Sequence, residues 1–562
     1  MITVIPTSLF GLRLAKATWG YREMRIDRRL LLKSVALGAG VLTLPAWAQV
    51  LDQRGFTHGV ASGEPGQDRV LLWTRYRPAA GGSGNLRWEV SPTADFARVV
   101  ADGEVETSPD RDWCLKPLAS GLSPGAWYYY RFVDRAGQLS PIGRTRTLPD
   151  GAVGRFTLGV FSCSNLPFGY FNAYGHAAAR ADIDLIIHLG DYMYEYEPGS
   201  YPSAEDSVAG RPIHPDHELL ALADYRLRYA TYRLDPDLQR LHQLFPFVTM
   251  WDDHESANNS WQGGAQNHQP ATEGDWSIRK AAAVRAYREW LPVSDDYWIN
   301  YRIGDLAELF RLESRLVART EQLSLTGFLR GRMDTAQALA EFRDGPWQSP
   351  ERTLLGLEQE AWLGTGLRSS VASRVKWQVL AQEVIMGSIS VGSELAALRD
   401  DTTDAARART ELALAAARAG LPNSMDMWDG YPAARARLLM ASQEASANLI
   451  VLSGDSHNAW AFELDGDGKP AGVEFAGHSV SSPGNERTFR GADPAALARA
   501  FLSANPQLKW TDTSRRGYLT LELTPQRATG EWVFMDTVRQ PSLDISDRHR
   551  MSVANGTNRF AA

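Results

Sequence analysis

Four apolar stretches of this sequence each run into a cluster of polar side chains that could bind metal ions. The clusters occupy residues 163–165 (CSN), 190–195 (GDYMYE), 252–255 (DDHE) and 454–458 (GDSHN). Their aspartates are hard oxygen donors. The cysteine, tyrosine and histidine of the same clusters suit a strongly Lewis-acidic or redox-capable ion such as iron. The donor set therefore favours more than one kind of metal ion.

The candidate ligands bring several carboxylates together, and this indicates a chemistry. The candidates, chosen by donor type, are Cys163, Asp191, Tyr194, Asp253, Asp455 and His457. Carboxylates gathered without cations would repel one another and raise their pKa values, and bound cations remove that problem. Paired metal ions about 3.5–4 Å apart clamp the attacking and leaving oxygens of a phosphate ester and make hydroxide available near neutral pH. We therefore expect hydrolysis of a phosphate ester.

The elements that must position these ligands are buried strands of an α/β domain. Continuous apolar runs begin at residue 156 and stand far apart, which is typical of strands buried on both faces between layers of helices. The runs occupy residues 156–161, 185–189, 247–251, 377–380 and 449–452. Amphipathic helical patterns separate them, over residues 216–242, 278–290, 355–370, 403–419 and 431–446. Because ligand sites of open α/β sheets form at the carboxyl ends of strands, we expect the four polar clusters to converge at one sheet edge.

The chain divides into parts of different character. Residues 52–148 are predicted to form an N-terminal domain of short β-strands, and the segment LSPGAWYYY at 122–130 is typical of fibronectin-type sandwiches. This domain has no cluster of titratable groups, so we expect a structural or substrate-flanking role. Residues 155–540 form the predicted catalytic domain, and residues 541–562 a C-terminal tail. Stretches rich in Arg, Ala and Leu at 300–350 and 390–430 predict helical insertions that could act as a lid.

Composition limits the class of protein. The 562 residues are too many for one core, and the formal net charge of -7 gives no reason to expect specific nucleic-acid binding. Two cysteines cannot build a disulfide scaffold. Cys163 alone could be an inert buried thiol; beside Asp191, Tyr194 and His457 we interpret it as a metal ligand.

An export signal is predicted at the start of the chain. Arg28 and Arg29 precede an apolar stretch that ends in the cleavage signal AWA at 46–48, as in bacterial twin-arginine signal peptides. Residues 1–48 are assigned to this peptide, and residues 1–23 could reflect an upstream mis-start. The apolar run is too short to span a bilayer comfortably, so we expect no stable membrane anchor. The predicted location is periplasmic or extracellular, reached through the twin-arginine translocation machinery.

The ordered set of motifs resembles the PhoD-like alkaline phosphatases/phosphodiesterases. The resemblance covers nearly all of the mature chain. Besides the four clusters, it rests on FTHGVASGEP (56–65), LWTR (72–75), NN (258–259), SSPG (481–484) and RRGY (515–518). It implies a four-layer α/β/β/α metallophosphoesterase domain of calcineurin-like type, preceded by a small fibronectin-like β-sandwich domain.

The resemblance also implies a set of metal ions and their ligands. It implies an Fe(III) ion and two Ca²⁺ ions; other divalent metals stay open, because ligand type alone does not fix metal identity. The implied iron ligands are Cys163, Asp191, Tyr194 and His457. The implied calcium ligands are Asp253, Asp455 and one of Asn258 or Asn259, with Asn258 preferred, and Asp191 would bridge the two kinds of site.

The resemblance further implies a catalytic role for His254 beside Asp253. His254 would contact a substrate oxygen and stabilise the transition state or protonate the leaving alkoxide. A metal-bound hydroxide would attack phosphorus in line. One departure from the family pattern concerns Glu313 and Arg315, which stand where relatives carry Asp-x-Arg. The substrate range is therefore open.

The sequence thus predicts a secreted metal-dependent phosphoesterase of the alkaline phosphatase D type. Its substrates would be phosphomonoesters, phosphodiesters or both: a small phosphate ester, a nucleotide or a phospholipid-derived molecule. One alternative is a phospholipase D-like phosphodiesterase that acts on lipid head groups. A second alternative is a non-catalytic binding protein on a degenerate phosphatase fold.

Overall fold

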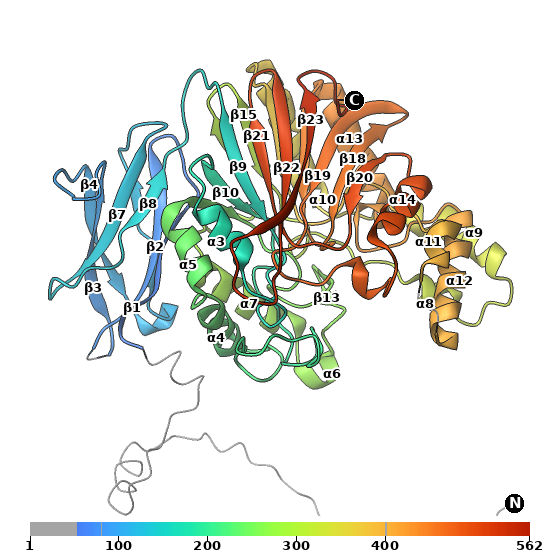
Figure 1. Cartoon of the computed structure of the whole chain (residues 1–562), viewed down its shortest axis with the longest axis horizontal. Coiled ribbons are helices and arrows are strands. Elements are labelled where there is room, and N and C mark those ends of the chain that lie inside the picture. Colours follow the sequence, from blue (N-terminus) through green and yellow to red (C-terminus); the bar gives the residue numbers. More distant parts are fainter. Residues whose placement is uncertain (1–52, 80, 400–401, 562) are drawn as a thin grey trace, which may run out of the picture. The chain divides into compact units, whose positions relative to one another are not determined.

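The computed structural model describes residues 53–79, 81–399 and 402–561 (Figure 1). The signal peptide predicted over residues 1–48 lies outside the described residues. Two large sheets pack face to face and carry helices on their outer faces, which gives the four-layer α/β/β/α arrangement (Figure 1). None of the helices in the described ranges is long and apolar enough to cross a bilayer.

The first large sheet contains three of the strands that lead into polar clusters. Its order is β23-β22-β21-β9-β10-β11-β1-β2-β5, in which β1 (Gly55–Gly63), β2 (Arg69–Arg77) and β5 (Cys114–Leu115) come from the N-terminal part of the chain. β9, β10 and β11 are parallel to one another, whereas β21, β22 and β23 form an antiparallel edge. The strands of this part are β9 (Phe156–Phe161), β10 (Leu185–His188), β11 (Pro246–Thr249), β21 (Gly517–Leu523), β22 (Arg527–Met535) and β23 (Ile545–Ala554). The last of these lies in the segment 541–562 and pairs with β22 along its whole length.

The second large sheet contains the fourth of these strands. Its order is β14-β15-β16-β17-β19-β18-β20, with β15, β16, β17 and β19 parallel. The strands are β14 (Ile299–Ile303), β15 (Ala307–Arg311), β16 (Trp377–Ala381), β17 (Leu449–Ser453), β18 (Ala459–Gly466), β19 (Lys469–Ala476) and β20 (Leu508–Asp512).

The core between the two sheets explains the continuous apolar runs. Leu158 and Ile187 from the first sheet meet Val379 and Ile450 from the second in one buried cluster. Every residue of β9, β10, β16 and β17 is buried, because helices cover the faces that do not meet the other sheet. A strand buried on both faces cannot alternate polar with apolar residues, and the sequence pattern follows from this.

Helices form the outer layers. α3 (Asn172–Ala178), α4 (Leu222–Tyr232), α5 (Pro236–Leu244) and α7 (Trp276–Trp290) pack against the first sheet in a single apolar cluster. α10 (Gly356–Ala372), α13 (Pro432–Ala445) and α14 (Pro494–Ala504) pack against the second sheet. The predicted helix over 216–242 is in fact two helices, because Asp235 caps a new helix and Pro236 occupies its first turn.

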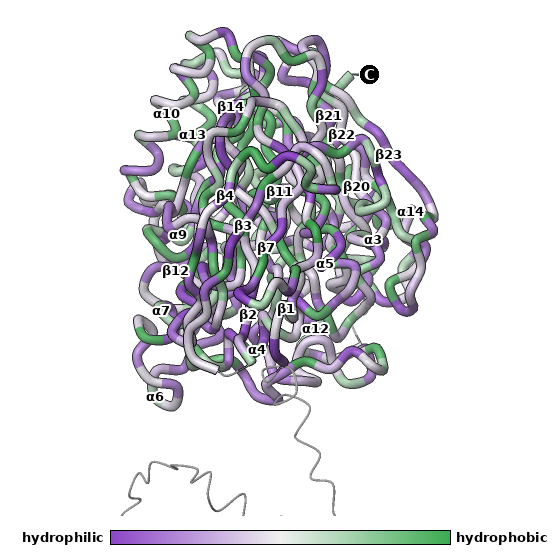
Figure 2. Tube along the Cα trace, turned by 90° about the vertical axis from the view of Figure 1, so that its left-hand side faces the viewer, coloured by the Kyte–Doolittle hydropathy of each residue, from purple (hydrophilic) through white to green (hydrophobic). Residues whose placement is uncertain are grey.

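The N-terminal part is a β-sandwich. One layer has the order β4-β3-β7-β8, and the facing layer consists of β1, β2, β5 and β6. The strands are β1 (Gly55–Gly63), β2 (Arg69–Arg77), β3 (Gly84–Ser91), β4 (Ala101–Thr107), β5 (Cys114–Leu115), β6 (Leu118–Ser120), β7 (Trp127–Asp134) and β8 (Gly143–Arg146). Exposed and partly buried residues alternate along β4, as expected of a strand with one solvated face. The strands of this layer carry both hydrophilic and hydrophobic segments (Figure 2). β1 also pairs in parallel with β11, so the sandwich continues the first large sheet.

The predicted helical insertions are correct only in part. Residues 299–311 form the hairpin of β14 and β15, and all five residues of β15 are buried. The prediction of a helix in this part is wrong, because packing of β15 against β16 outweighs helix propensity. Helices do occupy much of the remainder. They are α8 (Leu325–Leu329), α9 (Thr335–Asp344), α11 (Ser393–Ala397) and α12 (Asp404–Arg418). A small apolar cluster, separate from the cores of the two sheets, contains residues of both insertions.

Candidate metal centre

The polar clusters converge between two sheets. Cys163, Asp191 and Asp253 follow β9, β10 and β11 of the first sheet, and Asp455 follows β17 of the second. The prediction of one edge of a single sheet is therefore wrong in this detail. The carboxyl ends of strands from both sheets contribute donors to the same place, because the two sheets pack face to face.

Several candidate ligands have an unusual backbone. The φ angles of Cys163, Asp191, Asp455 and His457 are +61°, +55°, +55° and +61°. This left-handed region is sparsely populated by residues other than glycine, and such residues gather at functional sites. No sequence signal predicts this conformation.

A glycine allows two of these turns to approach one another. Gly190, directly before Asp191, has a φ of +94°. A Cβ atom at this position would lie 2.4 Å from the backbone nitrogen of Asp252. Only glycine lets the turn after β10 pass this close to the turn after β11.

The side-chain donors form three overlapping groups. Within each group, one potential ligand atom per residue lies within 4.8 Å of the others. The groups are Cys163–Asp191–His457, Asp191–Asp253–His254 and Asp252–Asp253–Asp455. Because Asp191 belongs to two groups and Asp253 belongs to two, the groups are fused into a continuous cluster. Such a cluster can hold more than one ion.

Tyr194 and His457 are oriented toward the first group. The Tyr194 hydroxyl donates to Asp191 Oδ2 at 2.9 Å and lies 3.2 Å from His457 Nε2. His457 Nδ1 lies 2.7 Å from the carbonyl oxygen of Pro483, which fixes the proton on Nδ1 and leaves the lone pair of Nε2 for the cluster. Ser482, which the sequence analysis marked only as part of a motif, lies 2.6 Å from the Tyr194 hydroxyl and donates to the carbonyl of Cys163.

Buried oxygen atoms without partners show that cations fit here. Asp191 Oδ1, Asp252 Oδ2 and Asp253 Oδ1 are buried and have no hydrogen-bond partner among the described residues. A buried carboxylate oxygen left in this way carries a desolvation cost, which a bound cation removes. The donors around them match the ligand chemistry of hard and borderline metal ions.

The pKa values of the free side chains lead to the same conclusion. Burial raises the pKa of Asp191 well above its usual value, and the charges of Asp253, Glu255 and Asp455 add to this. Burial also raises the pKa of the Cys163 thiol, with a further contribution from Asp191. Asp253 differs, because the charges of His254 and Arg315 outweigh the effect of burial and lower its pKa. The Cys163 thiol and the Asp191 carboxyl group therefore favour their protonated forms, and coordination to a metal ion supplies the positive charge that ionises them.

His254 lies beside the cluster and is held by Glu195. Its Nδ1 is 2.7 Å from Glu195 Oε2, and its Nε2 is 4.0 Å from Asp253 Oδ1. Burial lowers the pKa of His254, but the carboxylates of Asp253, Asp191 and Glu195 outweigh this and raise it well above the ordinary value. The raised pKa favours the protonated imidazole. Glu195 is the last residue of the motif GDYMYE, but its contact with His254 was not predicted from the sequence.

Both candidate asparagines lie next to these carboxylates. The backbone N–H of Asn258 donates to Glu195 Oε1, and its side-chain amide donates to Gln266. The backbone N–H of Asn259 donates to Asp253 Oδ2 at 2.6 Å, and its φ is +50°. Each is only partly buried, so the choice of Asn258 as a calcium ligand stays a prediction.

A buried arginine supplies the protein's own positive charge. Arg315 Nε donates to Asp252 Oδ1 at 2.6 Å, and its guanidinium also reaches Asp426 at 2.9 Å and Asp455 Oδ1 at 3.5 Å. Glu313 accepts hydrogen bonds from the backbone N–H of Arg315 and from Trp251 Nε1. Glu313, which departs from the family pattern, thus joins the Arg315 loop to the end of β11.

Comparisons with known proteins agree with this arrangement. The model of the family described as PhoD-like phosphatase matches residues 158–532, and the model of its N-terminal domain matches residues 43–149. Alkaline phosphatase D of Bacillus subtilis (strain 168) is 34% identical over 517 residues, which cover 88% of this chain and 80% of that protein.

Solved structures show the same fold. A structure titled "Structure of PhoD" matches with a TM-score of 0.73 and 32% identity, and the match covers 91% of this chain and 93% of that one. A purple acid phosphatase from yellow lupin (Lupinus luteus) seeds matches with a TM-score of 0.54 at 12% identity, covering 88% of this chain and 74% of the lupin chain. The lupin structure supports the fold alone.

Proposed function

This chain belongs to the PhoD-like phosphatase family and is a phosphoric ester hydrolase, and we propose that the fused cluster between its two sheets carries the reaction. One observation carries the proposal. Three buried carboxylate oxygens, of Asp191, Asp252 and Asp253, have no hydrogen-bond partner in the described structure, and a thiol, a phenol and an imidazole gather at the Asp191 carboxylate. This is a pre-formed cation site at the end of buried strands.

We propose that the cluster holds Fe(III) together with two Ca²⁺ ions. The iron would take Cys163, Asp191, Tyr194 and His457, because thiolate, phenolate and imidazole favour that ion. The calcium ions would take the oxygen donors Asp253, Asp455 and Asn258, with Asp191 shared between the two kinds of site. When bound, such ions polarise a phosphoryl oxygen and supply a nucleophile near neutral pH.

His254 is the proposed general acid. Glu195 fixes its Nδ1, so the Nε2–H faces Asp253 and the cluster. From this position Nε2 can stabilise charge on the departing oxygen and deliver a proton to it. The rings of Tyr194, Tyr196 and Tyr201 surround His254 and limit the access of water. Asp253 orients His254 by its charge and offers its unpartnered oxygen to the cluster.

The place of action is proposed from the sequence. The twin-arginine pattern within residues 25–48 supports export through the twin-arginine machinery to the periplasm or the exterior. The proposed substrates are small phosphate monoesters and diesters, including nucleotides and phospholipid-derived esters.

The test compares three substrates with the purified mature protein. We expect release of nitrophenol from nitrophenyl phosphate, from bis-nitrophenyl phosphate or from both, and loss of that activity with a strong chelator. The Asp191→Ala variant should lose both activity and bound metal, since Asp191 belongs to two donor groups. Undiminished hydrolysis after chelation would refute the proposal. Turnover of phosphatidylcholine in preference to both nitrophenyl esters would support the phospholipase D-like alternative instead.

A further inference from the structure

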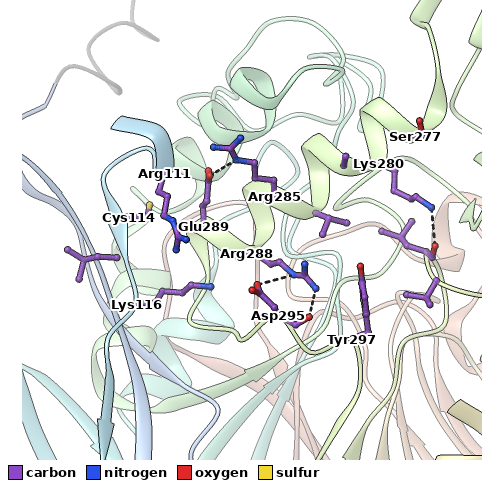
Figure 3. Close-up of a pocket in the computed structure, with 15 residues that line it drawn as sticks. Arg111, Cys114, Lys116, Ser277, Lys280, Arg285, Arg288, Glu289, Asp295 and Tyr297 are labelled. Carbon is purple, nitrogen blue, oxygen red and sulfur yellow. Dashed lines mark hydrogen bonds and ion pairs between the residues drawn. The ribbon is translucent and has the colours of Figure 1, made fainter. Parts of the chain in front are cut away.

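A cavity of about 710 Å³ lies apart from the metal centre, between α7 and the sandwich segment that contains β5 (Figure 3). Its walls include residues of α7, Arg111, residues 114–116, and Leu316 and Val317. None of the candidate metal ligands lines it. Its size is that of a pocket for a small molecule.

The cavity walls carry an excess of positive charge. Five cationic side chains line it, namely Arg111, Lys116, Lys280, Arg285 and Arg288, against the two carboxylates Glu289 and Asp295. Glu289 is already engaged by Arg285 and, from outside the cavity, by Arg226. Asp295 is largely exposed and lies 3.5 Å from Arg288. The carboxylates therefore do not balance the five cations.

Two of the cations keep donor capacity for a ligand. Lys116 Nζ donates to the carbonyl of Val293 at 2.6 Å, and Lys280 Nζ donates to the carbonyls of Gln262 and Leu316 at 2.9 and 3.4 Å. Neither forms an ion pair with a carboxylate in the part of the chain that the structure describes. An ammonium group has three N–H donors, so each lysine can bind a further acceptor.

Most of the remaining wall is apolar. Leu115, Ala281, Val284, Leu316, Val317 and the ring of Tyr297 line the cavity. Tyr297 stands on the opposite side from Arg285 and Arg111 in Figure 3. A ligand complementary to both kinds of wall has an anionic head and an apolar body.

We propose that this cavity binds an amphipathic organic anion, such as a medium-chain carboxylate, at a site separate from the metal centre. The cationic side chains bind the head group, and the apolar walls take the hydrocarbon body out of water. The proposal does not depend on the nature of the reaction at the metal centre.

The test is calorimetric titration of the mature protein with octanoate. Acetate supplies the anionic head without the body, and octyl glucoside supplies the body without the charge. We expect saturable binding of octanoate at one site per chain and much weaker binding of both controls. Lys280→Glu should weaken octanoate binding about tenfold, since a favourable charge interaction becomes an unfavourable one. Ala281→Trp, which fills the cavity without changing its charge, should abolish binding.

Matched variants separate this site from general effects. Lys469→Glu makes the same charge change on an exposed residue outside the cavity and should leave octanoate binding unchanged. Asp191→Ala should also bind octanoate as the unmodified protein does. The proposal fails if octanoate does not bind, if either control ligand binds equally well, or if Lys469→Glu weakens binding as much as Lys280→Glu. Loss of binding in Asp191→Ala, with an unchanged melting temperature, would place octanoate at the metal centre and also overturn it.

Discussion

Replacing Glu195 with glutamine tests the role of His254 most sharply. The 2.7 Å contact between Glu195 Oε2 and His254 Nδ1 is buried and is assisted by charge when His254 is protonated. Glutamine keeps the size and one hydrogen bond but removes the negative charge. A hydrogen bond to a charged group contributes about 2 kcal/mol, which corresponds to roughly thirtyfold in rate when the proton donor is needed.

The assay compares leaving groups. An alkyl phosphate releases a strongly basic alkoxide and needs the proton of His254, whereas nitrophenyl phosphate releases a stable phenolate and does not. We expect Glu195→Gln to lower kcat roughly thirtyfold for the alkyl ester and no more than about threefold for the nitrophenyl ester. The matched control is Glu474→Gln. Glu474 is a buried glutamate on β19 that accepts hydrogen bonds from the backbone of Met386 and Gly387, and its replacement should leave both rates unchanged. An equal loss for the two esters would refute the role of His254 as proton donor.

Three further predictions concern stability. Gly190→Ala should lower the free energy of unfolding by about 3 kcal/mol, because the new Cβ atom would meet the backbone of Asp252. Gly82→Ala is the control: its φ is also positive but its surroundings are open, so it should lower the free energy of unfolding by about 1 kcal/mol. Equal losses for the two variants in thermal denaturation would contradict this prediction. Arg315→Met should destabilise the metal-free protein by about 3–5 kcal/mol in denaturant titration, because the carboxylate of Asp252 loses its buried partner. Arg368→Met, at an exposed position, should change the free energy of unfolding little. Burial raises the pKa of Glu383 to about 8, whereas the pKa in the unfolded chain is 4.5. Between pH 4.5 and pH 8, Glu383 therefore keeps its proton in the folded protein and loses it on unfolding. The free energy of unfolding should therefore fall as pH rises through that window, and Glu383→Gln should remove this part of the slope; an unchanged slope would contradict it.

The buried strands and the main donors could be predicted from the sequence because their signals are local. β9 has the predicted bounds, and β10 and β17 differ from prediction by a single residue at one end. Such strands are buried on both faces and so read as uninterrupted apolar runs. The donors that follow them belong to short motifs, so Cys163 and Asp191 could be recognised from residue type and position alone.

The contacts that orient these donors could not be predicted, because they join distant segments. Ser482 reaches Tyr194 across 288 positions, and Arg315 reaches Asp426 across 111 positions. The hairpin of β14 and β15 was predicted as helix because Arg, Ala and Leu dominate its surroundings. Its burial beside β16 decides its conformation, and only the packed structure contains that information.

The most direct test is a crystal structure of the exported, active protein with anomalous diffraction recorded above and below the iron edge. The account predicts an iron peak within bonding distance of Cys163 Sγ, Asp191 and His457, with further cation density between Asp253 and Asp455. Active crystals in which those side chains bind no ion, or in which the ions lie elsewhere, would contradict it.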